Sequence, residues 1–255
     1  MRNVVVTVAY DGTNYLGWQK TNLDTTQPSI EYLLQTTLEQ IVQHPTPLQA
    51  ASRTDRGVHA EDQVVNFFVE NEALDLDRLQ HSLNCLLPPD IRVLTIQDAP
   101  KTFHATVDTK KKQYLYRIYK GPVLLPALRF THWHILLPLD LEKMHIAANI
   151  LIGEHDFIAF RNMRKGIDYN DTVRTVIDIQ IEEKGAVLEI KVTANNFLYK
   201  MCRNIIGTMV YVAAGKLSPG SVATLLQGGK RADAGITAPA HGLTLHKVYY
   251  ASRCF

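Results

Sequence analysis

The sequence predicts a mixed α/β (α+β) fold. Apolar residues make up 46% of the 255 residues and charged residues 20%, which is the balance of a globular protein with a substantial core. Runs rich in Val, Ile and Tyr alternate apolar and polar residues as strands do, and stretches with apolar residues at helical spacing separate them. The connections between the strand-like runs are short, which favours antiparallel pairing.

The first half of the chain shows strand-like alternation followed by two helical stripes. Residues 4–10 alternate, and after Pro28 apolar residues recur at helical spacing over 30–41. A second helical stripe covers 76–86, and the intervening stretch 52–62 is expected to be a loop dense in charge. Further strands are expected at 48–51, 64–69 and 91–96.

The second half repeats this alternation. Asp140 is a suitable N-cap for a helix ending at Leu151, and the longest helical stripe covers 197–214, before Gly215. A short helix is expected after Ser218 and Pro219. The expected strands are 113–119, a hairpin formed by 172–182 and 186–194, and 243–250.

The charge pattern suits a polyanionic partner but does not require one. The formal net charge is only +2, so local clusters matter more than the total. Any one cluster is ordinary for a solvated surface, whereas several of them favour a groove that binds a polyanion. The clusters are residues 110–112, Arg161 with Arg164 and Lys165, Lys200 with Arg203, and Lys230 with Arg231.

Cysteine use and hydropathy favour a cytoplasmic, soluble protein. The chain has three cysteines, at positions 85, 202 and 254, without the spacing of a disulfide framework or a zinc site. Free thiols suit a reducing compartment. No apolar leader follows Met1, and the apolar stretch 205–214 is too short for a membrane, which needs about 20 residues. We therefore expect neither a metal nor a membrane.

The loop at 52–60 is the strongest candidate for chemistry. It places Asp55 between Arg53 and Arg56 and follows them with Gly57. Neighbouring cations favour an ionised carboxylate, and glycine permits a close approach or a positive φ. An ordinary surface turn with local ion pairs would have the same composition.

This loop resembles the catalytic loop of the TruA family of tRNA pseudouridine synthases. The resemblance extends over nearly the whole chain, in the order of the family's motifs. The matching residues are 10–13, Tyr15, 17–19, 53–55, 57–60, Leu87, Pro88, Asp90, Ile91, 103–105, the Lys-x-Tyr-x-Tyr run 112–116, Phe197, Leu198, Met201, 203–207, 238–240, Gly242, Leu243 and Leu245.

The resemblance implies two similar α/β halves that share a mixed, mainly antiparallel sheet with a central basic catalytic cleft. The halves are expected at 1–104, carrying the Asp55 loop, and at 105–255. It also implies a homodimer that isomerises uridine at positions 38–40 of the tRNA anticodon stem-loop without a cofactor. Asp55 is then the catalytic residue, either as a nucleophile or as a base that removes a ribose proton.

The resemblance also implies residues that bind the substrate. Tyr114 would stack on the uracil, with Tyr116 as the rival, and Arg203 would pair with the catalytic carboxylate. Arg53 would fill the gap left by a flipped base or contact a phosphate. Val58 and Leu243 would line the uracil pocket or simply pack in the core. The expected RNA contacts are Asp11, Gly12, Trp18, which would stack or anchor its loop, Lys112 and Lys200.

The sequence departs from the family pattern at several positions, and three alternative functions therefore stay open. Ser52, Arg56, Asp62 and Asn196 stand where the family usually has other residues, and Glu61 with Asp62 adds acid beside the site. These differences bear on the choice of RNA, and another RNA uridine is the first alternative. An RNA-binding protein without catalysis is the second. A glycoside hydrolase is the third, although such enzymes normally use two paired carboxylates.

Overall fold

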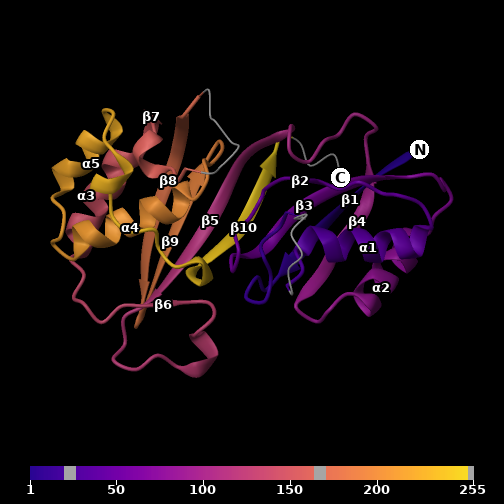
Figure 1. Ribbon diagram of the computed structural model, residues 1–255, viewed down its shortest axis with the longest axis horizontal. Helices are drawn as coiled ribbons and strands as arrows, with labels where there is room; N and C mark the ends of the chain where they lie inside the picture. Colours follow the sequence, from indigo (N-terminus) through magenta and orange to yellow (C-terminus); the bar gives the residue numbers. More distant parts are fainter. Residues whose placement is uncertain (20–26, 164–170, 252–255) are drawn as a thin grey trace. The chain divides into compact units, whose positions relative to one another are not determined.

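The structure is a computed structural model that describes residues 1–19, 27–163 and 171–251. The chain forms two compact units, Met1–Lys110 with Thr244–Phe255, and Lys111–Leu243. The division expected after residue 104 stays a prediction about domains. By packing, the change of unit falls between Lys110 and Lys111, and the last strand belongs largely to the first unit. Figure 1 labels the elements of both units.

The first unit is built on an antiparallel strand core with β1 in its middle. Strand β1 pairs with β4 on one side and with β3 on the other, β2 adds to β3, and β10 joins β3 in parallel through Thr244 and Leu245. The helices contact one another, and α2 packs against β4. The elements are β1 (Arg2–Tyr10), α1 (Ile30–Val42), β2 (Gln49–Ala50), β3 (His59–Val69), α2 (Leu76–Leu86), β4 (Ile91–Ala99) and β10 (Leu243–Tyr250).

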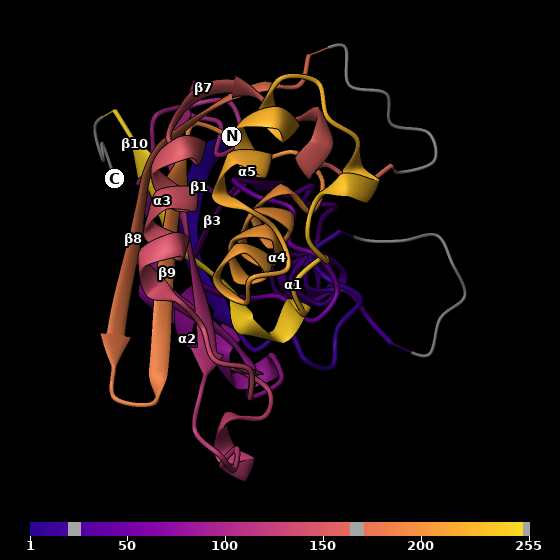
Figure 2. The ribbon, with the colours of Figure 1, turned by 90° about the vertical axis from the view of Figure 1, so that its left-hand side faces the viewer.

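The second unit pairs four strands in the order β5-β9-β8-β7, all antiparallel, and β6 joins β5 in parallel. Figure 2 shows α3 running along β8 and contacting α4 and α5. The elements are β5 (Thr109–Tyr119), η1 (Pro126–Leu128), β6 (Trp133–His134), α3 (Leu141–Leu151), β7 (Gly153–Asp156), η2 (Ile158–Phe160), β8 (Val173–Lys184), β9 (Val187–Ala194), α4 (Met201–Ala213), α5 (Pro219–Leu226), η3 (Arg231–Asp233) and η4 (Ala240–Gly242).

Short polar side chains begin four of the helices. The side chains of Ser29, Asp75, Asp140 and Ser218 each accept a hydrogen bond from a backbone N–H in the first turn. Such caps satisfy donors that have no partner inside the helix. Pro28, expected at the start of the first helix, lies one residue before its cap.

The fold class is confirmed, since strands and helices alternate and the pairing is mainly antiparallel. Strands β6 and β7 were not expected, β4 extends to Ala99 instead of residue 96, and β5 begins at Thr109 instead of residue 113. Two further boundaries differ for reasons that the structure shows. Strand β3 begins at His59, because His59 and Ala60 already pair with β10 and β1, so the loop is shorter than 52–62. Helix α4 begins at Met201 and not at residue 197, because Lys200 has a left-handed φ of 60°.

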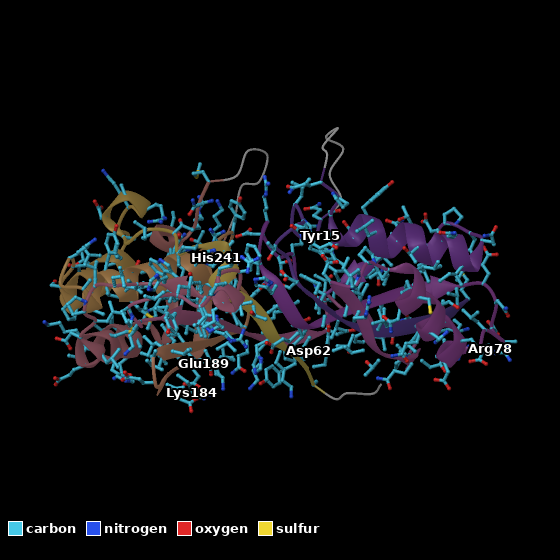
Figure 3. All side chains as sticks on the ribbon, turned by 90° about the horizontal axis from the view of Figure 1, so that it is seen from below. Tyr15, Asp62, Arg78, Lys184, Glu189 and His241 are labelled. Atoms are coloured by element: carbon cyan, nitrogen blue, oxygen red, sulfur yellow. The ribbon has the colours of Figure 1, made fainter. Side chains whose placement is uncertain are left out.

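Three further points bear on the sequence expectations. Arg164, Lys165 and Cys254 lie outside the described residues. In the described segments no helix is both long and apolar enough to span a bilayer. Lys184, labelled with Glu189 in Figure 3, lies at the end of the β8–β9 hairpin. It pairs with Glu182 and Glu189, so this cation is already neutralised within the unit.

Candidate active site

The Asp55 loop, residues 52–58, connects β2 to β3 in the first unit. Asp55 is half-buried, whereas the flanking Arg53 and Arg56 are exposed. Gly57 has a φ of 77°, and the N–H of Val58 donates to the carbonyl of Asp55 at 3.1 Å. This tight turn therefore needs the glycine, because a side chain rarely adopts such a φ.

Buried neutral groups hold the loop from beneath. The side chain of Gln63 accepts from the N–H of Ser52 at 3.2 Å and donates to its carbonyl at 2.6 Å. The hydroxyls of Tyr10 and Thr54 lie 2.7 Å apart in the interior, and burial raises the pKa of Tyr10. The backbone on the N-terminal side of Asp55 is thus bonded to the strand core.

A second segment, the N-terminal strap (residues 11–18), crosses the Asp55 loop. The N–H of Trp18 donates to the carbonyl of Thr54 at 3.0 Å, and Gly17 forms a β-bridge with Asp55. A Cβ on Gly17 would lie 2.5 Å from the Thr54 oxygen, and one on Gly12 would lie 2.0 Å from the Val58 oxygen. These approaches are possible only for glycine, so the strap and the loop form one rigid layer.

The two ends of the strap are anchored separately. His59 is buried, and its Nδ1 lies 3.1 Å from the N–H of Gly12 and 3.1 Å from a carboxylate oxygen of Asp11. Burial would raise the pKa of Asp11, but hydrogen bonds from Thr13 lower it below its ordinary value. At the other end Trp18 is 1% exposed and packs beside Tyr10. The indole therefore anchors the strap.

The strap is also bonded to helix α1 and to the chain before β4. The first N–H groups of α1, from Ile30 and Glu31, donate to the carbonyls of Gly17 and Trp18 at 3.1 and 2.9 Å. The hydroxyl of Tyr15, labelled in Figure 3, donates to Asp90. These bonds fix the strap along its length.

The residues that depart from the family pattern have partners inside the first unit. Glu61 lies 2.6 Å from the imidazole of His246, and Asp62 accepts from the N–H of Val248 at 2.9 Å. Arg56 donates to Gln27 at 2.6 Å. The carboxylates of Glu61 and Asp62 are therefore hydrogen-bonded to strand β10.

In the second unit, Tyr114 and Tyr116 lie on one face of strand β5. The Tyr114 ring packs edge-on against Phe197, with centroids 5.0 Å apart. The Tyr116 ring is fully buried, and its hydroxyl donates to the carbonyl of Pro239 at 2.9 Å. Burial raises the pKa of Tyr116. Tyr116 is thus a core residue. Tyr114 is also buried, at 6% exposed, and its role in stacking on a base stays a prediction.

Arg203 lies in the first turn of α4, directly after the Lys200 cap. Its Nε donates to the carbonyl of Ala238 at 2.8 Å, and the N–H of Ala238 donates to the Arg203 carbonyl at 3.1 Å. Lys200 is half-buried, with its ammonium 5.1 Å from the centre of the Tyr199 ring. Leu243 is buried. Two cations therefore lie at the positive end of the α4 dipole.

Lys112 differs from the other candidate RNA contacts because it is only 7% exposed. Its ammonium donates to Asn196 at 3.3 Å, and burial lowers its pKa to about 8. Its side chain is therefore largely removed from solvent.

Within the first unit, the structure brings Asp55 and Val58 together with Asp11, Gly12 and Trp18 of the strap. Within the second, it places Arg203 and Lys200 in one helix turn. Sequence analysis named Tyr10 and Asn204 only as motif residues and Arg231 only as part of a basic cluster, and it assigned none of them, nor Gln63, the role of holding these positions. Polar residues inside apolar runs, such as Gln63 in 63–69, were the available signal. In the described part of the chain, no group of three or more His, Cys, Asp or Glu side chains could hold a metal ion.

Comparisons with known proteins cover almost the whole chain. The profile of a family described as tRNA pseudouridine synthase matches residues 6–108 and 147–251. The protein named tRNA pseudouridine synthase A 2 from Protochlamydia amoebophila is 48% identical over 98% of this chain and 95% of its own length. The tRNA pseudouridine synthase A from Thermoanaerobacter sp. is 42% identical over 98% of this chain and all of its own length.

A solved structure of a Cbf5–Nop10–Gar1 complex aligns weakly, with a TM-score of 0.40 at 11% identity over 96% of this chain and 50% of that chain. The family profile and the two relatives, by contrast, match both units, including the Asp55 loop and helix α4. The chain belongs to the tRNA pseudouridine synthase family, whose members are isomerases.

Proposed function

We propose that this protein isomerises uridine to pseudouridine at positions 38–40 of the tRNA anticodon stem-loop, with Asp55 as the catalytic carboxylate and no cofactor. The observation that carries the proposal is the way Asp55 is held. Its loop is bonded to the strand core by Gln63 and Tyr10 and is covered by the strap at Gly17. A carboxylate fixed in this way is preorganised for one reaction geometry.

The proposed reaction conserves every atom of the nucleoside. The bond between ribose C1′ and uracil N1 breaks, the base turns, and a bond between C1′ and C5 forms, while the C5 proton leaves and N1 gains one. The separation and rejoining involve no net oxidation or reduction. A single carboxylate beside the sugar is therefore sufficient chemistry for Asp55 to supply.

We propose that the target uridine leaves its stack before it reacts, which costs a few kcal/mol. Arg53 is exposed on the same loop as Asp55, which suits a role in filling the vacated space or binding a phosphate. Tyr114 would stack on the extruded uracil, a contact that contributes about 1–3 kcal/mol in single-strand binders. Val58 and Leu243 would exclude water from the base.

Arg203 and Lys200 are proposed to meet negative charge from the substrate complex. Two cations at the N-terminal end of a helix are disfavoured by its dipole and are stabilised by an anion placed there. In this proposal Arg203 pairs with the Asp55 carboxylate and Lys200 with tRNA phosphate. Asp11 and Gly12 would contact the RNA through the exposed part of the strap.

We further propose that the enzyme acts in the cytoplasm as a homodimer. Exposed apolar side chains gather within residues 123–137, where Val123, Leu136 and Leu137 are each more than half exposed. Such side chains suit burial against a second copy of the chain. Sedimentation equilibrium of wild type and Leu136→Asp would test this, since a mass unaffected by the substitution would exclude the segment from the interface.

The test of the catalytic proposal is carbodiimide mapping of pseudouridine in tRNA treated with wild type, Asp55→Asn or Glu61→Gln. We expect wild type to modify uridines 38–40 and Asp55→Asn to lose at least about 1,000-fold in rate. Glu61→Gln is the matched control, because it removes an acid six residues away and should stay within about threefold of wild type.

Each alternative has its own outcome in this assay. Tight tRNA binding without pseudouridine would indicate a binding protein, and release of free uracil would indicate a hydrolase. A product at other uridines, with positions 38–40 unmodified, would overturn the proposed site on the tRNA and leave the reaction intact.

A further inference from the structure

We infer that Arg231 is a positioning residue that fixes Arg203, an inference that rests on the proposed role of Arg203. Arg231 lies in a segment that we call the C-terminal brace, residues 231–239, which packs along helix α4. Two glycines make the contact possible. A Cβ on Gly207 of α4 would lie 1.7 Å from the Ile236 oxygen, and one on Gly235 would lie 2.5 Å from the Gly207 oxygen.

The guanidinium of Arg231 joins the brace to α4. Its Nη2 donates to the side chains of Asn204 and Thr237, both at 3.0 Å, and its Nη1 donates to the carbonyl of Gly235 at 2.8 Å. Its Nε donates to Asn162 at 3.3 Å. These acceptors are all neutral, so the group acts as a rigid fork of donors, which a lysine cannot reproduce.

Asn204 transmits this arrangement to the neighbouring Arg203. The Asn204 amide is fully buried and makes four hydrogen bonds: it donates to Phe160 and Asn162 and accepts from Arg231 and Thr237. An asparagine amide has two donors and one oxygen with two lone pairs, so all four of its hydrogen-bonding positions are used. The first turn of α4 is therefore locked in rotation about its axis.

The brace then holds the Arg203 side chain itself. Arg231 donates to Thr237, and the next residue in the chain is Ala238. The carbonyl of Ala238 accepts from Arg203 Nε at 2.8 Å. The next carbonyl, of Pro239, accepts from Tyr116. The Nε bond fixes the plane of the Arg203 guanidinium, so a shift of the brace would turn that plane even though Arg231 touches no substrate.

The test is a double-mutant cycle on the single-turnover rate of pseudouridine formation at saturating enzyme. Arg231→Lys keeps the charge and loses the fork, and we expect the rate to fall about 10- to 100-fold with tRNA affinity within about threefold of wild type. In an Arg203→Ala background the same substitution should change the rate less than about threefold, because the residue it positions is absent.

Thr237→Val is a milder second variant, which removes one hydroxyl from the network and should give a smaller loss with the same dependence on Arg203. Leu225→Ala controls for stability, because it empties a buried site in α5 and should leave the rate of folded enzyme unchanged. Equal losses from Arg231→Lys in both backgrounds, or a full rate in that variant, would overturn the inference. An inactive wild type would instead overturn the proposed function.

Discussion

The Asp55 loop of the first unit and the first turn of α4 in the second are both held by a crossing segment, but the means differ. The Asp55 loop is held by backbone bonds from the strap and by two neutral side chains of the strand core, Tyr10 and Gln63. The brace holds Arg203 through a half-buried cation, Arg231, whose pKa is lowered by its burial. The carboxylate thus lies on a nearly neutral support, and the arginine on a positively charged one.

This difference has a physical reason in the proposed reaction. Hydrogen bonds from neutral groups fix the position of the Asp55 loop and add no further charge beside the reacting carboxylate. Around Arg203, the added positive charge of Arg231 lowers the stability of the free protein. Binding of a polyanion restores that stability. The second unit therefore gives up stability where tRNA is proposed to approach.

The largest expected effect is a loss of stability when the brace is displaced from α4. In Gly207→Ala the new methyl would lie 1.7 Å from the Ile236 oxygen, so the brace must move away from α4. We expect a loss of about 3 kcal/mol or more in the free energy of unfolding, measured with urea. Gly220→Ala in α5 is the control, since its nearest atom is 3.9 Å away and alanine favours a helix. Equal stability of the two variants would show that the close approach is unimportant.

The next effect concerns the strap. Gly17 combines a φ of 100° with a Cβ position 2.5 Å from the Thr54 oxygen, so Gly17→Ala should displace the Asp55 loop. We expect the single-turnover rate to fall about 100-fold. Gly185→Ala shares the positive φ, at 61°, but meets nothing within 4 Å. It should lose about 1 kcal/mol of stability and keep its rate. A normal rate in Gly17→Ala would show that the strap does not position Asp55.

The smallest expected effect is the pH dependence of stability that comes from Lys112, a buried lysine of the second unit. Lys112 has a pKa of about 8 in the folded chain, against 10.5 when unperturbed. Between these values the unfolded chain keeps a proton that the folded chain has lost, so this residue's contribution to stability rises with pH. Lys112→Met should therefore be more stable than wild type at pH 7, by on the order of 1–3 kcal/mol, and lose that advantage by about pH 10.5.

Urea unfolding at several pH values measures this difference. Lys110→Met is the control, because Lys110 is exposed on the same strand and its replacement should change little at any pH. A constant difference between wild type and Lys112→Met across pH 7 to 10.5 would mean that Lys112 keeps its proton in the folded state.

Much of the fold could be predicted because its elements carry local patterns. Strand β10 has the expected bounds, and α2 and α3 follow their apolar spacing and capping residues. The errors arose where tertiary pairing extends or cuts a local pattern. Strand β3 begins at His59 because β1 and β10 pair there, and α4 starts late because Lys200 leaves helical geometry.

The sequence by itself determined most of the strands, the Asp140 cap, the family and the candidate residues Asp55, Tyr114 and Arg203, because these depend on neighbours in the chain or on motifs of a few residues. Only the tertiary structure decided that Trp18 anchors a strap, that Tyr116 belongs to the core, and that Arg231 braces α4. Those contacts join residues from about 25 to more than 100 positions apart. They depend on how the chain closes on itself, which no local pattern encodes.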